Sequence, residues 1–148
     1  MTRHRRSNVP RPSMIPGPWV AHPVALIKLF PALSLAARRI LDVLEIEHCR
    51  HGRRDNGRLV CTYSNFEQGG VRRGSIFGAL RELVAVGLIE IPRLGRRSYA
   101  DLRLPSMYRL TFEPTYVDGK RVEPTHDWKK QNLRARNPQG PDRYPGSR

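Results

Sequence analysis

Two short segments of the chain gather residues that could bind a polyanion. They contain Arg72, Arg73, Ser75, Gly78 and Arg81 in one segment, and Arg93, Arg96 and Arg97 in the other. A guanidinium group offers a planar fork of N–H donors, which matches phosphate oxygens and the O6 and N7 acceptors of guanine. The free amides at the start of a helix also favour phosphate. These eight residues are therefore the candidate DNA-binding residues of the chain.

The elements around the first segment are expected to be a short helix, a turn and a longer helix. Thr62 or Ser64 can cap the short helix, and Gly69-Gly70 breaks it. The longer helix starts at Arg73 or Gly74 and runs to about Val86. Its apolar residues recur at helical spacing on one side, at Ile76, Ala79, Leu80, Leu83 and Val84. That side would hold the helix in the domain and leave its first turn free to enter a major groove.

Two residues of the longer helix have roles of their own. Gly78 would let the helix approach its ligand closely on the face that it shares with Ser75. Phe77 either closes the core against Phe66 or contacts a thymine methyl group, and the core role is favoured. Arg93, Arg96 and Arg97 lie in a loop between two expected strands, where they would contact the flanking phosphate backbone.

The remaining elements complete a recognisable order. A first short helix is expected between Pro23 and Pro31, and Ser34 can cap a second helix that ends near Gly52. The apolar stripe of this second helix is predicted to contain Leu35, Ala36, Ile40, Val43, Leu44 and Glu47, with Glu45 on another face. Strands are expected at residues 59–61, 88–91 and 107–112, the last two joined by a wing loop. The expected fold is mostly α with a small β-wing, a winged helix-turn-helix.

Composition sets the domain organisation and the class of partner. The 148 residues carry a formal net charge of +14, which favours nucleic acid, although an arginine excess also occurs in proteins from GC-rich genomes. Residues 1–18 are expected to form a disordered basic arm and residues 19–117 the winged domain. Residues 118–148 form a basic, proline-rich tail that is expected to be mostly extended or disordered, with Trp128 able to dock on the domain.

Other chemistries receive little support. His48, Cys49, His51 and Cys61 lack the paired spacing of zinc ligands, so no metal is expected. Glu45 and Glu47 are two apart on a helix and face different directions, which does not suit an acid/base pair. There is no phosphate-binding glycine motif or nucleophile elbow, so we expect neither a cofactor nor an enzyme. With two cysteines and no long apolar run, a cytoplasmic, nucleoid-associated protein without membrane contact is expected.

A resemblance extends over roughly residues 33–128. The segments "EIEH", "NGRLVCTY" and "GVRR", followed by "PSMYRLTF" and "PTHDW", resemble a family of small bacterial helix-turn-helix proteins of poorly defined role. More distantly, the chain is similar to the winged-helix modules of plasmid and phage replication initiators and regulators. The resemblance implies a winged fold and DNA binding, but it does not specify a target site or a process.

The predicted function is sequence-specific binding of double-stranded DNA. It would serve regulation of transcription, or replication or transfer of a mobile element. One alternative is an adaptor whose winged domain binds a protein while the basic tails hold nucleic acid nonspecifically. RNA binding is a third reading that rests on charge alone, since aromatic residues make up only 7% of the chain. A protein partner or a homodimer is left open.

Overall fold

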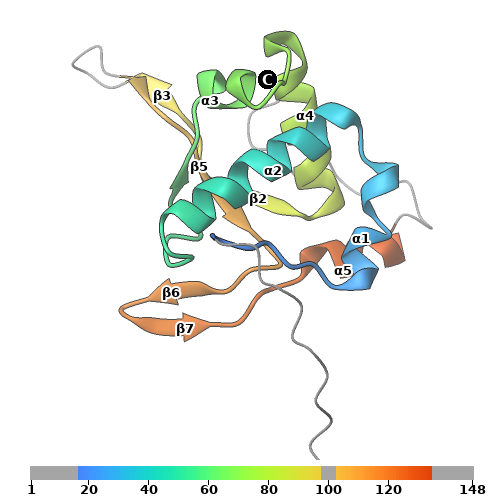
Figure 1. Ribbon diagram of the computed structural model, residues 1–148, viewed down its shortest axis with the longest axis vertical. Helices are drawn as coiled ribbons and strands as arrows, with labels where there is room; N and C mark the ends of the chain where they lie inside the picture. Colours follow the sequence, from blue (N-terminus) through green and yellow to red (C-terminus); the bar gives the residue numbers. More distant parts are fainter. Residues whose placement is uncertain (1–16, 98–102, 135–148) are drawn as a thin grey trace, which may run out of the picture.

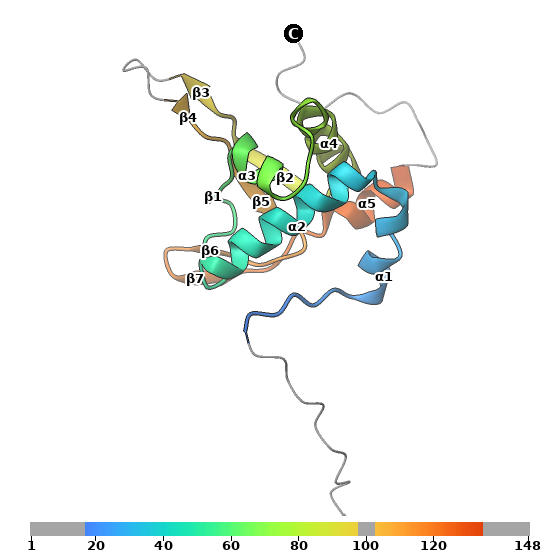
Figure 2. The same ribbon diagram turned by 45° about the horizontal axis from the view of Figure 1, so that its top comes forward.

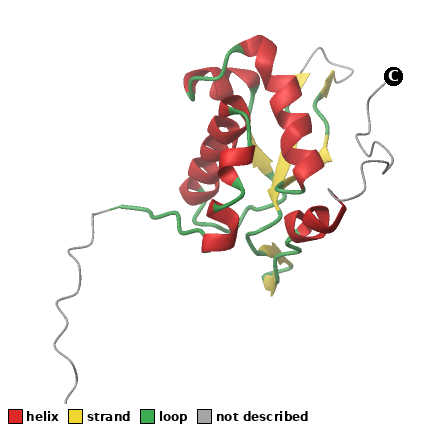
Figure 3. Cartoon of the chain, turned by 90° about the vertical axis from the view of Figure 1, so that its right-hand side faces the viewer, coloured by secondary structure: helices red, strands yellow, loops and turns green. Residues whose placement is uncertain are grey.

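The computed structural model describes residues 17–97 and 103–134. Within these residues the chain forms a mixed α and β domain, in which the helices are combined with a small antiparallel sheet. The helices pack beside the small sheet (Figure 3). Residues 1–16 of the expected basic arm, residues 98–102 of the expected wing loop and residues 135–148 lie outside the described residues.

The N-terminal elements are α1 (Val24–Ile27), the 3-10 helix η1 (Phe30–Ala32) and α2 (Leu35–Arg50). Ser34 caps α2 as predicted, because its hydroxyl accepts a hydrogen bond from the Ala37 amide at 3.1 Å. The buried face of α2 differs from the predicted one, since Leu35 is 66% exposed. The face consists of Ala37, Ile40, Leu41, Leu44, Glu45 and His48. Two polar residues thus belong to the buried stripe, which an apolar pattern alone could not reveal.

The three-stranded sheet has β5 (Met107–Leu110) at its centre. β1 (Leu59–Val60) and β2 (Ile89–Arg93) pair with it on either side, both antiparallel. The register runs from Ile89 opposite Leu110 to Arg93 opposite Met107, with an irregularity between Glu90 and Arg93. Beyond it, β3 (Arg96–Arg97) and β4 (Arg103–Leu104) form a separate antiparallel pair that extends away from the sheet (Figure 1).

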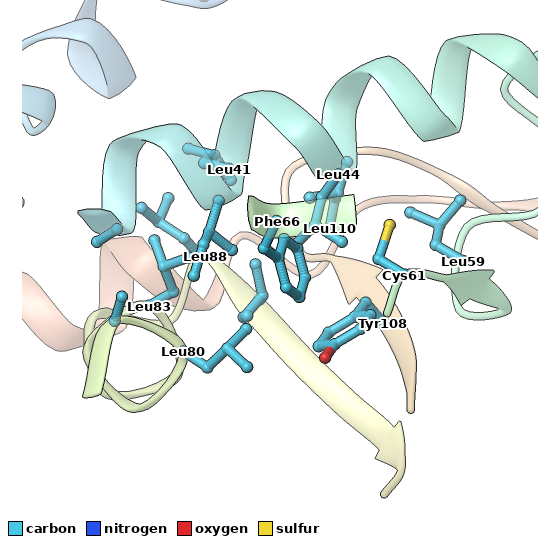
Figure 4. Packing of buried hydrophobic residues seen from close by; sticks show 14 of the residues in the cluster. Leu41, Leu44, Leu59, Cys61, Phe66, Leu80, Leu83, Leu88, Tyr108 and Leu110 are labelled. Carbon is cyan, nitrogen blue, oxygen red and sulfur yellow. The ribbon is translucent and has the colours of Figure 1, made fainter. Parts of the chain in front are cut away.

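The core lies between the sheet and the helices α2, α3 (Tyr63–Gln68) and α4 (Arg73–Val86). Phe66 packs edge-to-face on Tyr108, with 5.8 Å between ring centroids. Leu41 and Leu44 of α2, and Leu80 and Leu83 of α4, belong to the same buried cluster as these rings (Figure 4). One continuous core therefore holds α4 against α2 and the sheet.

The segment from residue 115 to 134 forms β6 (Thr115–Val117), β7 (Lys120–Val122) and α5 (Asp127–Arg134). The boundary expected at residue 117 thus falls within a β-hairpin, and residues 118–134 differ from the extended tail that was expected. Trp128 is only 3% exposed and joins the core. The backbone of α5 lies so close to Gly87 that a Cβ atom there would meet the Trp128 amide at 2.9 Å.

Candidate nucleic-acid interface

The turn between α3 and α4 is fixed by local capping and by close packing on α2. Thr62 and Asn65 form a capping box at the start of α3. A Cβ atom at Gly69 would lie 2.3 Å from a methyl carbon of Val43, so a larger residue there would require Val43 to shift. Gly70 follows with φ of +84°, a left-handed conformation that favours glycine. These contacts fix the orientation of the start of α4 relative to α2 and α3.

Arg39 of α2 is a residue of this region that the sequence did not single out. Its guanidinium donates a hydrogen bond of 2.6 Å to the carbonyl oxygen of Gly70. This contact ties the exposed side of α2 to the α3–α4 turn. Arg39 is exposed beside the α3–α4 turn. Its position on the polar face of α2 was visible in the sequence, but its contact with a residue 31 positions away was not.

α4 is held by its buried face and by one polar contact. Ile76, Ala79, Leu80 and Leu83 are buried, as predicted. Glu82 accepts hydrogen bonds from the backbone amide of Ser34 at 2.7 Å and from its hydroxyl at 2.6 Å. α4 ends at Gly87, which is left-handed with φ of +83° and serves as the predicted C-terminal glycine.

The first turn of α4 exposes its polar residues. Arg72 is the N-cap residue, and its side chain makes no capping hydrogen bond. Arg73 is held more firmly, because it pairs with Glu67 at 3.0 Å and lies over the ring of Tyr63. Ser75 is exposed and lies on the same turn. The structure thus brings these three predicted site residues together at one helix end.

One turn further along α4, the structure corrects the expectation for Phe77. Its side chain is 48% exposed and does not close the core against Phe66. The buried stripe of α4 passes through Ile76 and Leu80 and leaves position 77 outside it. The guanidinium of Arg81 lies over the Phe77 ring, 5.9 Å from its centroid.

Gly74 and Gly78 lie on the same exposed side as Phe77. A Cβ atom at either position would meet no other atom within 4 Å. Packing within the described domain therefore does not require glycine at these positions. Gly78, in the interior of α4, costs the helix about 1 kcal/mol relative to alanine. An uncompensated cost on an exposed helix face is consistent with close approach of a ligand to the helix backbone.

The second arginine segment lies on β2 and the β3–β4 strand pair. Arg93 and Arg96 are exposed, and Arg97 pairs through its backbone with Arg103. Gly95 comes directly before β3, and a Cβ atom on it would meet the carbonyl oxygen of Leu104 at 2.9 Å. The β3–β4 pair, α3 and the start of α4 lie at the end of the molecule opposite the β6–β7 hairpin (Figures 1 and 2).

Arg109 shows that an arginine near the sheet can have a different role. It bonds Glu90 at 2.8 Å and Thr125 at 3.2 Å, and it lies 3.8 Å from Asp127. These contacts link β5, β2 and the segment that leads into α5. Burial opposes ionisation of Asp127, but hydrogen bonds from Lys130 and Thr125 outweigh it and lower the pKa of this carboxyl.

A second group of titratable residues lies inside the domain, away from the arginine segments. Glu45 is buried and bonds the imidazole of His22, with Arg38 3.9 Å away. Burial raises the pKa of Glu45 above its usual value. His48 is buried and lies 3.5 Å from Glu113. Burial also opposes ionisation of Glu113, but the nearby imidazole of His48 outweighs it and lowers the pKa of this carboxyl.

The histidines and cysteines considered as zinc ligands have separate surroundings. His51 bonds Glu47 at 2.8 Å and lies 3.2 Å from Asp55. Cys61 is buried, which raises the pKa of its thiol to about 12 and disfavours the thiolate that binds zinc. Among residues 17–97 and 103–134, no group of three or more histidine, cysteine or acidic residues is placed to hold a metal ion.

Within the same described residues, no helix has the length and apolar character needed to cross a membrane.

Comparisons of the chain with protein-family models, with curated proteins and with solved structures found no match. The resemblance to small bacterial helix-turn-helix proteins therefore stays a prediction.

Proposed function

We propose that this protein binds double-stranded DNA sequence-specifically through a winged helix-turn-helix domain, in which α4 is the recognition helix. The order of elements supports this fold: α2, β1, α3 and α4 are followed by β2, the β3–β4 pair and β5. In this arrangement α3 and α4 form the helix-turn-helix, and β2 and β5 lead into and out of the wing.

One observation carries the proposal. α4 buries Ile76, Leu80 and Leu83 in the core, while Arg72, Arg73 and Ser75 are exposed at its first turn. The helix is thus anchored on one side and presents hydrogen-bond donors on the other. Arg93 and Arg96 lie on strands at the same end of the molecule (Figure 1). They would grip the backbone beside the groove that α4 enters.

The acids near α4 are already engaged within the domain. Glu67 pairs with Arg73, and Glu82 accepts hydrogen bonds from Ser34. The overall charge of +14 adds long-range attraction for DNA. The protein would act as a regulator of transcription, or in the replication or transfer of a mobile element, without catalysis, metal or cofactor. Its DNA target would place it at the nucleoid.

An adaptor function is the second candidate, and one observation favours it. Val24 and Ile27 of α1 are exposed apolar side chains, and Trp19 just before them is half exposed. They could contact a protein partner or a second copy of the chain. In that case the arginine segments would hold nucleic acid without reading its sequence.

Sequencing the DNA fragments that are recovered with the protein from its own cells tests the proposal. A shared motif, enriched sharply at discrete sites, is expected for sequence-specific binding. Diffuse coverage of the genome, without a motif, would contradict it and favour the adaptor.

A further inference from the structure

Phe77 is the residue of α4 whose surroundings the proposed function does not yet explain. Single exposed apolar side chains are common on protein surfaces, so its 48% exposure alone carries nothing. Phe77 differs from other exposed apolar residues in its neighbours on the helix. Gly74, Gly78 and Arg81 are neighbours of Phe77 along this exposed side of the helix, and positions 74 and 81 are three and four residues away.

This face combines the apolar ring of Phe77, the positive charge of Arg81, and helix backbone that Gly74 and Gly78 leave uncovered by side chains. The guanidinium of Arg81 lies over the ring of Phe77, which limits the directions in which both side chains can point. No other atom would lie within 4 Å of a Cβ atom at Gly74 or Gly78. A ligand can therefore reach Phe77 and Arg81 from the side without being held off by neighbouring side chains.

Helix width decides which groove could accept this face. An α-helix with its side chains is about 10–12 Å across, which fits the major groove of about 12 Å but not the minor groove of about 6 Å. In the major groove the apolar group on a base edge is the 5-methyl of thymine, and the preferred partner of arginine is guanine.

We propose that Phe77 contacts the 5-methyl group of a thymine and that Arg81 binds a guanine one or two base pairs away. The spacing follows from the roughly 5–6 Å between side chains four apart on a helix, compared with roughly 3.4 Å per base pair. The inference rests on the proposed function and adds to it the bases that this face reads. A protein surface is the competing occupant. The guanidinium of Arg81 over the ring, and the exposed Arg72 and Arg73 at the start of the same helix, favour DNA instead.

The test uses a probe that removes the methyl group alone. The full chain first selects its preferred site from random double-stranded DNA. Each thymine of that site is then replaced by deoxyuridine, and the dissociation constant is measured for the wild type and for Phe77→Ala. At one position, one or two base pairs from a guanine, the loss of the methyl should weaken wild-type binding about fourfold, the value for one buried methyl group. The same replacement should leave the affinity of Phe77→Ala unchanged.

Two further variants keep the result interpretable. Ile46→Ala removes an apolar side chain of α2 that is 50% exposed, and it should keep the full dependence on the methyl. Phe77→Leu should keep part of it, because it retains an apolar contact. The inference is overturned if a preferred site exists but no deoxyuridine replacement weakens binding, or if Phe77→Ala keeps the wild-type dependence. If no preferred site is selected at all, the proposed function itself fails, and this inference with it.

Discussion

Arg72 and Arg73 are neighbours in the chain, but the structure gives them different surroundings. Arg73 is steered by Glu67 and by the ring of Tyr63. Such an exposed ion pair contributes little to stability, about 0–1 kcal/mol, so its main effect is to orient the guanidinium. Arg72 makes no capping bond with its side chain. One of the two can therefore bind a base edge while the other grips a phosphate.

The double variant Arg72→Ala/Arg73→Ala tests this pair. We expect specific binding to weaken by at least about 1–3 kcal/mol, the value for one bidentate contact with guanine. The midpoint of thermal unfolding should change little, because neither residue is buried. A matched control is Arg50→Ala/Arg121→Ala, which removes two exposed arginines from the last turn of α2 and from β7. Equal losses in both variants would mean that charge alone, and not position, determines binding.

Glu45 gives a second prediction at the scale of a single residue. Its pKa is raised in the folded protein, mainly by burial, from an ordinary value of 4.5. The folded state therefore binds this proton more tightly than the unfolded state does. The contribution of Glu45 to stability is fully present below pH 4.5 and is lost as pH rises through the folded pKa.

Urea unfolding of the wild type and Glu45→Gln between pH 4 and pH 7 measures this contribution. The free energy of unfolding of the wild type minus that of the variant should fall as pH increases. The glutamine can still accept a hydrogen bond from His22, so packing is conserved. A difference that grows with pH would show that Glu45 is stabilised in its ionised form.

At the scale of the element, α4 holds two glycines that its own fold does not need. Replacing Gly78 by alanine should raise the free energy of unfolding by about 0.5–1 kcal/mol, because the helix gains propensity and the new methyl has open space. The same variant should bind DNA more weakly, because the methyl lies where the groove would approach. Urea unfolding measures the expected gain in stability, and a binding titration measures the expected loss of affinity for DNA. A more stable variant with unchanged affinity would exclude close contact at Gly78.

The element boundaries that depend on neighbouring residues could be predicted from the sequence. Ser34 caps the start of α2, Thr62, one of the two expected caps, caps the start of α3, and Gly87 ends α4, because capping is satisfied within a few residues. The turn at Gly69-Gly70 and the buried side of α4 follow from the same local signals.

The features that depend on distant contacts could not be predicted in this way. Glu45 belongs to the buried face of α2 because His22, 23 residues earlier, supplies its partner. β6 and β7 follow a loop that Asn56 anchors, by accepting from the Leu110 amide at 2.7 Å and donating to the Glu113 carbonyl at 3.0 Å. Phe77 lies beside the buried stripe of α4, and how far the core extends toward position 77 depends on the packing of α4 against α2 and the sheet.

At the scale of the whole molecule, much of the positive charge lies outside the described residues. Residues 1–16 contain four arginines and no acid, and residues 135–148 contain three arginines and one aspartate. Together they supply six of the fourteen net positive charges. We expect them to add affinity through release of phosphate counterions, and not through reading of bases.

A chain that spans residues 17–134 tests this expectation and keeps α5 with Trp128 intact. It should retain the preferred sequence of the full chain but bind it more weakly at low salt. Its affinity should also fall less steeply with salt, and each phosphate that the shorter chain no longer neutralises should reduce the logarithmic slope by roughly 0.9. Loss of sequence preference in the folded, shortened chain would show that one of the removed segments reads DNA.

The central claim is that the domain reads a DNA sequence, and the ratio of two affinities tests it most directly. The measurement is a competition titration at physiological salt, in which the full chain binds its best selected site in the presence of a scrambled duplex of equal length. Sequence-specific recognition through α4 predicts a preference of roughly a thousandfold or more. Equal affinities for the two duplexes would contradict the claim and leave the basic surface as a nonspecific nucleic-acid contact.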